Sequence, residues 1–146
     1  MGRVIAIDYG RKRTGIAVTD INRMIASPLT TIRSDETEKF LSGYLEREDV
    51  DVIVIGYPKQ MNNKPSEAVK YINPFVRKLR KLFPHKELIL EDERLTTVMS
   101  LKAIIEGGVK KKERRDKSLA DKISASLILR SYLDRSEMKN KKQENK

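Results

Sequence analysis

Three acidic positions are best placed to do chemistry, because each one borders or interrupts an apolar stretch of the chain. Asp8 ends the apolar run 4–7, the acidic cluster 91–93 ends a second apolar run, and Asp121 lies near the start of the last helical segment. Neighbouring parallel strands end at one edge of a sheet, and a helix that begins there would bring a third carboxylate to the same point. Carboxylates gathered in this way could hold two Mg²⁺ ions and promote the hydrolysis of a phosphodiester.

The donor types favour a hard metal ion over zinc. Mg²⁺ prefers oxygen ligands and keeps several waters, so a few carboxylates and a substrate phosphate are enough to hold it. Zinc sites are built mainly from His and Cys, whereas this sequence contains one His and no Cys. The lack of Cys also leaves no disulfide and no cysteine nucleophile, and it fits a reducing, cytoplasmic setting.

Two of the acids also have a purely structural interpretation. A carboxylate where a buried strand meets solvent is costly unless a cation pairs with it. An ion pair with Arg11 or Arg13 therefore explains Asp8 about as well as a metal does. Asp121, in the first turn of a helix, would by default complement the helix dipole.

Strand alternation divides the acidic cluster 91–93. Glu91 and Glu93 should lie on one face of the strand and Asp92 on the other, because successive side chains of a strand point to opposite faces. At most two of the three acids can therefore point into one site. Spacing alone does not choose the face.

The charge balance indicates a polyanionic partner. The formal net charge is +10, and nucleic acid is the commonest partner of so basic a chain. The loop 109–117 holds six Lys or Arg against two acids just before the helix of Asp121, which favours contacts to phosphate over a merely solvated connector. With three Phe, five Tyr and no Trp, base stacking on single strands is not strongly supported. The candidate phosphate-contacting residues of the loop are Lys110, Lys111, Lys112, Arg114 and Arg115.

The elements that would position these residues form a single α/β domain over residues 1–135, with a polar, basic and disordered tail expected over 136–146. The apolar runs on either side of the turn 10–15 predict a hairpin, and the run 4–7 predicts a central strand buried on both faces. The apolar run 52–56 should add a strand parallel to the first, which gives a mixed sheet. The other expected elements are an edge strand at 24–33, helices at 34–48, 66–83, 96–107 and 119–133, and a last strand beginning at 88.

Three single residues predict local features of these elements. Pro28 marks an edge or irregular position, since proline cannot donate to a strand ladder. Ser34 or Asp35 should cap the helix that follows. Pro74 should kink the helix 66–83 or restart it.

Five motifs, in this order, resemble those of the YqgF (RuvX) family of Holliday junction resolvases and pre-16S rRNA nucleases. Of these, the segment Asp-Glu-Arg-Leu-Thr-Thr is the most specific, and the resemblance runs from about 4 to 133. It implies an RNase H-like fold, in which a mixed five-stranded sheet is flanked by helices, and metal-dependent phosphodiester hydrolysis by an acidic triad. The motifs are IDYG at 7–10, RTGIAV at 13–18, IGYP at 55–58, DERLTT at 92–97 and DKISA at 121–125.

The resemblance also implies a role for individual residues. The implied metal ligands are Asp8, Glu93 and Asp121, with Asp92 as the less favoured alternative to Glu93. Gly10 and Gly15 would permit the tight hairpin. Arg13 would lie near the substrate phosphate, and Arg94 would orient an acid or contact phosphate.

The leading hypothesis is a cytoplasmic endonuclease that depends on Mg²⁺ or Mn²⁺ and processes the 5′ end of pre-16S rRNA. The alternatives are a Holliday junction resolvase and a non-catalytic RNA-binding factor for ribosome assembly. An actin-like or sugar-kinase-like ATPase ranks last, because those enzymes need two lobes and this chain has room for one. We expect a monomer or homodimer without a membrane segment. Paired cuts in a junction would require the dimer.

Overall fold

The computed structural model describes residues 2–58, 67–92 and 114–144, and within the last range it describes the side chains of 121–137. Five strands and three α-helices are described, together with one short 3-10 helix, η1. The helix expected at 96–107 lies outside the described residues. The elements are β1 (Arg3–Tyr9), β2 (Arg13–Thr19), β3 (Ala26–Arg33), η1 (Ser34–Glu36), α1 (Thr37–Arg47), β4 (Val50–Tyr57), α2 (Val69–Leu82), β5 (Glu87–Asp92) and α4 (Arg114–Glu144).

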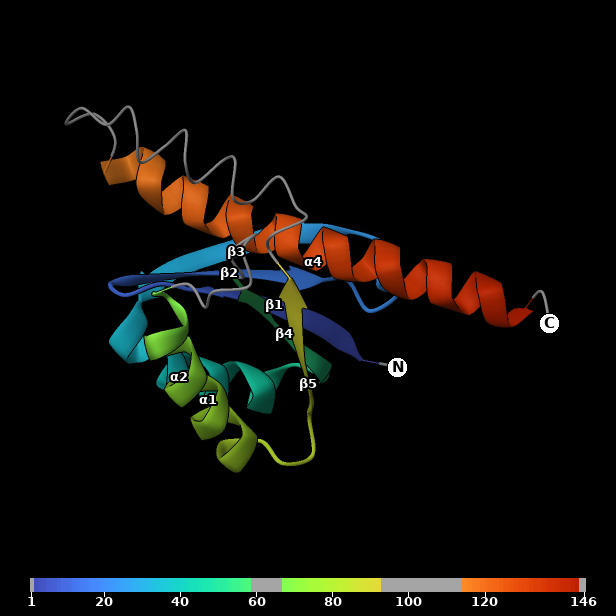
Figure 1. The fold of residues 1–146 in the computed structure, drawn as a ribbon, viewed down its shortest axis with the longest axis horizontal. Helices are drawn as coiled ribbons and strands as arrows, with labels where there is room; N and C mark the ends of the chain where they lie inside the picture. The colour runs from blue at the N-terminus through green and yellow to red at the C-terminus, as the bar shows by residue number, and fades with distance from the viewer. Residues whose placement is uncertain (1, 59–66, 93–113, 145–146) are drawn as a thin grey trace.

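The five strands form one mixed sheet in the order β3-β2-β1-β4-β5. Strands β1, β2 and β3 pair antiparallel, whereas β4 and β5 run parallel to β1. Helices α1 and α2 cover one face of this sheet, and α4 lies across the other face (Figure 1). The arrangement confirms the predicted hairpin, the parallel strand and the α/β class with a mixed five-stranded sheet flanked by helices.

The central strand β1 is buried on both faces, as its unbroken apolar run predicts. Residues Val4, Ile5, Ala6 and Ile7 have no exposed surface. Because side chains alternate along a strand, the isoleucines pack with α1 and α2, whereas Val4 and Ala6 pack with α4. The face toward α4 carries small residues on the hairpin, so that helix can lie close to the sheet.

Strand β3 is the edge strand that Pro28 predicts. Pro28 lies opposite Ala17, and the register of β3 against β2 shifts beside it, between Ile16 and Ala17. A proline is tolerated at such a place because its missing N–H breaks no regular ladder.

The predicted capping role of Ser34 is wrong. The hydroxyl of Ser34 instead donates to the carbonyl of Gly10 at 2.6 Å and hydrogen-bonds the hydroxyl of Thr14 at 2.9 Å. No side-chain hydrogen bond caps η1 or α1, and Asp35 pairs with Arg33. Ser34 thus holds the hairpin turn against the start of α1, because a buried hydroxyl must find a partner wherever tertiary structure offers one.

The structure bears on the predictions for two helices. Helix α2 runs through Pro74 as one element and does not restart there. Helix α4 starts at Arg114 and ends at Glu144, so it crosses residue 135 and is helical over most of the tail that we expected to be disordered. The segment after 134 contains neither Gly nor Pro and is rich in Glu, Lys, Gln and Arg, which favour a helix although they leave no apolar periodicity to recognise. In the part of the chain that the structure describes, no helix has both the length and the apolar character of a membrane span.

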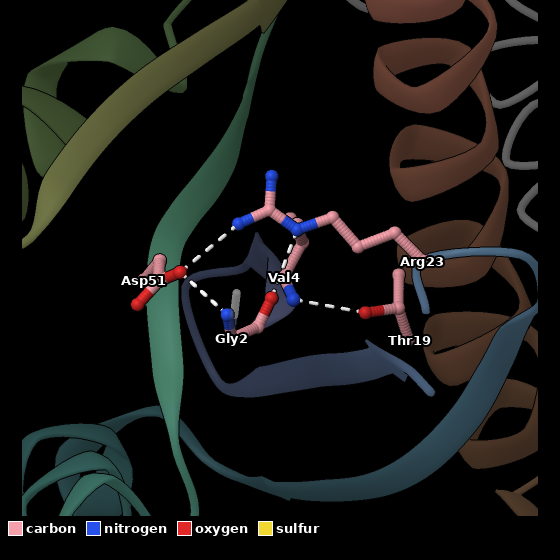
Figure 2. Close-up of polar contacts among 5 residues, drawn as sticks. All are labelled: Gly2, Val4, Thr19, Arg23 and Asp51. Atoms are coloured by element: carbon pink, nitrogen blue, oxygen red, sulfur yellow. Dashed lines mark hydrogen bonds and ion pairs between the residues drawn. The ribbon is translucent and has the colours of Figure 1, made fainter. Parts of the chain in front are cut away.

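A clasp formed by Gly2, Arg23 and Asp51 ties the start of β1 to β4 and to the β2–β3 turn (Figure 2). The Gly2 N–H donates to Oδ2 of Asp51 at 2.6 Å, and Arg23 donates to the same oxygen at 3.2 Å and to the Gly2 carbonyl at 2.8 Å. Beside the clasp, the Val4 N–H donates to the hydroxyl of Thr19 at 2.9 Å. The backbone of Arg23 is left-handed, with φ of 57°, which turns its side chain into this contact.

The clasp should make stability depend on acid pH. The hydrogen bond from Gly2, helped by the nearby Arg23 cation, lowers the pKa of Asp51 below its ordinary value of 3.8. A carboxyl with a lowered pKa stabilises the fold above its ordinary pKa and loses that contribution as the pH falls through the lowered value. We therefore expect the native chain to be more stable than Asp51→Asn at neutral pH, with the difference vanishing well below pH 3.8. Urea unfolding of both proteins across this range measures it, and a difference that does not change with pH would contradict it.

Candidate active site at the end of the central strand

Asp8 lies at the end of β1 on the face that α4 covers. Strand alternation gives it the same face as Val4 and Ala6, and its side chain is buried, with 6% of the residue exposed. Its direct neighbour across the hairpin is Gly15 of β2. The missing side chain of Gly15 leaves room beside Asp8 that the main chain of α4 occupies.

Gly15 has a different role from the predicted one. The hairpin turn is closed by Gly10, whose N–H donates to the carbonyl of Arg13 at 3.0 Å, whereas Gly15 lies within β2. A Cβ on Gly15 would overlap the main-chain carbonyl of Asp121. Gly15 is therefore a point of close contact between α4 and the sheet. Because Gly15 lies opposite Asp8 in the hairpin, this contact brings the backbone of Asp121 next to the strand partner of Asp8.

Asp121 does not lie in the first turn of its helix. Helix α4 begins at Arg114, which makes Asp121 its eighth residue, too far along for the helix dipole to explain the acid. The carboxylate instead accepts a hydrogen bond from Nε of Arg13, with 2.8 Å between Nε and Oδ2. This ion pair joins the hairpin turn to α4, and the sequence motifs alone did not reveal it.

The structure resolves which face of β5 lies toward α4. Glu91 is on that face and 6% exposed, and it accepts hydrogen bonds from Ser131 at 3.1 Å and from Nη2 of Arg135 at 2.6 Å. The bond to Glu91 raises the pKa of Arg135 above its ordinary value. In the parallel ladder of β4 and β5, Asp92 lies beside Tyr57, whose ring packs on the α1 and α2 side of the sheet. Residues side by side in a ladder share a face, so Asp92 is on the face opposite Asp8.

The remaining predicted site residues cannot be placed in the same way. Glu93, Arg94, Lys110, Lys111 and Lys112 lie outside the described residues. The backbone of Arg114 and Arg115 forms the first turn of α4, and their side chains are also outside the description.

The donor set agrees with a hard divalent ion. Asp8 and Asp121 offer carboxylate oxygens on one side of the sheet, and such oxygens suit Mg²⁺ or Mn²⁺. Within the described ranges no group of three His, Cys, Asp or Glu residues could hold a metal. A third protein ligand would therefore have to come from elsewhere in the chain. Glu93, the ligand that the family resemblance implies, lies outside the described residues.

Comparison with known proteins identifies the family. The family model described as "RuvX: Holliday junction resolvase" matches residues 2–135. The chain belongs to the RuvX family. This membership confirms the resemblance that the motifs predict, and it covers every described strand together with most of α4.

Relatives of this RuvX-family chain are similar over nearly their whole length. A Parabacteroides distasonis protein named "Putative pre-16S rRNA nuclease" is 55% identical over 134 residues, which is 92% of this chain and 96% of the relative. A Bacteroides thetaiotaomicron protein of the same name is 52% identical over 92% of this chain and 97% of the relative. The structure titled T. thermophilus RuvC in complex with Holliday junction substrate has 15% identity and a TM-score of 0.49, covering 93% of this chain and 97% of that one, a likeness too distant to bear on function.

Proposed function

We propose that this RuvX-family chain is a nuclease that depends on a divalent metal ion and processes the 5′ end of pre-16S rRNA in the cytoplasm. The observation that carries the proposal is the buried Asp8 at the end of the central strand, with Asp121 brought to the neighbouring strand position by Gly15. The names of the most similar relatives favour the rRNA substrate.

Asp8, Asp121 and Glu93 would hold Mg²⁺ or Mn²⁺ in this proposal. When bound, such an ion would act as a Lewis acid on a phosphoryl oxygen and would lower the pKa of a water molecule that can attack the phosphorus atom. Asp8 contributes a carboxylate at a position that burial keeps rigid, since every residue before it on β1 from 4 to 7 is fully buried. Asp121 is held at the sheet by the close approach at Gly15 and by Arg13.

Basic residues around these acids would bind the nucleic-acid backbone. The net charge of +10 supplies a general attraction to phosphate. The residues proposed to contact phosphate in addition are Arg94, Lys110, Lys111, Lys112, Arg114 and Arg115. Binding should weaken steeply with salt, because each neutralised phosphate releases condensed counterions.

A second candidate function is the resolution of Holliday junctions, which the description of the matching family model favours. Symmetric cuts in two strands require two active sites related by a two-fold axis, so this function would need a homodimer. The rRNA function has no such requirement, and the mass of the protein in solution therefore separates the two candidates. A monomer at working concentration would exclude paired junction cutting.

Cleavage assays test the proposed function directly. The purified chain is incubated with a pre-16S rRNA 5′ leader and, separately, with a four-way DNA junction, in Mg²⁺, in Mn²⁺ and in a chelator. We expect cuts in the RNA leader that need the metal ion, and weaker or no cutting of the junction. Salt-dependent RNA binding with the same uncut RNA under all three conditions would contradict the proposal and favour a non-catalytic assembly factor.

A further inference from the structure

Arg13 is the cation that reaches Asp121, although the two residues are 108 positions apart in the chain. Its Nε donates to Oδ2 of Asp121 at 2.8 Å, a short distance typical of a charge-assisted hydrogen bond. The side chain of Asp121 is 23% exposed and that of Arg13 is 43% exposed. The contact therefore lies at the rim of the candidate site, where orientation matters more than net stabilisation.

Both ends of this contact are attached to rigid backbone. Arg13 is the first residue of β2, and its carbonyl accepts the hydrogen bond from Gly10 that closes the hairpin turn. In the antiparallel ladder of β2 and β3, it lies opposite Arg33. On the other side, the backbone of Asp121 rests against Gly15. Because the backbone of both residues is held in place, the Arg13 guanidinium can select one orientation of the Asp121 carboxylate.

We propose that Arg13 is a positioning residue, which orients the Asp121 carboxylate toward the metal ion and does not mainly contact a substrate phosphate. The inference rests on the proposed function. Metal-ligating carboxylates are commonly oriented by a hydrogen bond from a neighbouring group, and losing such a partner typically costs about 10–100-fold in metal affinity or activity. The planar guanidinium of Arg suits this task better than the ammonium of Lys.

The two possible roles of Arg13 predict different defects. If Arg13 orients Asp121, its loss weakens metal binding even when no nucleic acid is present. If Arg13 binds phosphate, its loss weakens nucleic-acid binding, and the removal of a nearby positive charge leaves metal binding unchanged or tighter.

Titration calorimetry with Mn²⁺ alone, in the absence of nucleic acid, distinguishes these roles. We expect Arg13→Gln to weaken Mn²⁺ binding by about 10–100-fold. The Mn²⁺ affinity of Arg13→Lys should lie between those of the native chain and Arg13→Gln. Arg33→Gln is the matched control, because Arg33 is the strand partner of Arg13 and its exposed side chain pairs with Asp35. It removes the same charge, and its Mn²⁺ affinity should equal that of the native chain.

A double-mutant cycle shows whether Arg13 acts through Asp121. In an Asp121→Asn background, the change Arg13→Gln should have little further effect on Mn²⁺ affinity, because the group that it orients is already lost. Equal effects of Arg13→Gln in both backgrounds would overturn the inference. Thermal unfolding serves as the check on folding, and if Arg13→Gln is unfolded, Arg13→Lys replaces it in the cycle.

The inference and the proposed function fail in different ways. Native Mn²⁺ binding with an equal or tighter affinity in Arg13→Gln would overturn the positioning role and leave the proposed nuclease intact. If the native chain binds no Mn²⁺ and cleaves no RNA, the proposed function itself fails, and the role of Arg13 fails with it.

Discussion

Replacing Asp8 with Asn is expected to abolish cleavage and to leave nucleic-acid binding intact or tighter. The substitution removes one negative charge with little change in shape, so it removes a metal ligand and also reduces repulsion of the phosphate backbone. A bound metal ion supplies several kcal/mol of charge stabilisation, and each ~1.4 kcal/mol is tenfold in rate. We therefore expect the rate of RNA cleavage to fall by at least about 100-fold.

Cleavage rate and RNA affinity must be measured on the same preparation of Asp8→Asn. Asp35→Asn is a suitable control, because Asp35 is exposed and its carboxylate forms an ion pair with Arg33. This control should cleave like the native chain. If Asp8→Asn gives the same cleavage trace as the native chain, Asp8 is not a metal ligand and its burial has a structural explanation.

Replacing Gly15 with Ala is expected to destabilise the fold and to impair metal binding together. The new Cβ would overlap the main chain of Asp121, and a main-chain atom cannot move aside as a flexible side chain can. Overpacking of this kind costs about 2 kcal/mol or more, which corresponds to a fall in Tm of roughly 4–8 °C for a chain of this size. The same displacement of α4 would carry Asp121 away from Asp8, so Mn²⁺ affinity should fall as well.

Gly43→Ala is the matched control for this substitution. Apart from the backbone of α1 itself, a Cβ on Gly43 in the middle of that helix would meet no atom within 4 Å. Because Ala is favoured over Gly inside a helix, this change should raise stability by about 0.5–1 kcal/mol. Opposite shifts in Tm for the two variants are expected in thermal unfolding. A Gly15→Ala protein with native Tm and native Mn²⁺ affinity would show that the contact with α4 does not position the site.

The central sheet could be predicted from the sequence because its signals are local. Unbroken apolar runs at 4–7 and 52–56 indicate strands buried on both faces, and the structure contains them as β1 and β4. The glycine-containing turn between two apolar runs likewise indicates a hairpin. The acid Asp8 stands out in the sequence because it ends one of these runs.

The role of Gly15 could not be predicted, because the atoms that it makes room for belong to a helix far along the chain. A glycine near a hairpin is ordinarily assigned to the turn, and only the position of α4 shows that the space beside β2 is the requirement. For the same reason, the ion pair between Arg13 and Asp121 could not be predicted from the sequence. Both depend on how α4 crosses the sheet, which has no local signature.

The choice among the strand-end acids also depended on the placement of α4. Alternation separates Asp92 from Glu91, but the face that carries Asp8 is known only once the helix is in place. Glu91 is buried against Ser131 and Arg135, two partners on α4 that the spacing of the acids does not reveal. Arg135 lies beyond the end of the last helix that the sequence predicts, at 133, because the apolar periodicity stops before it.

Anomalous scattering from a crystal soaked in Mn²⁺ shows whether Asp8 and Asp121 share one divalent ion. We expect an anomalous peak within coordination distance of carboxylate oxygens from both residues, with Glu93 as a further ligand and Asp92 on the other side of the sheet. A peak that contacts neither aspartate, or no bound Mn²⁺ at concentrations that support cleavage, would contradict it.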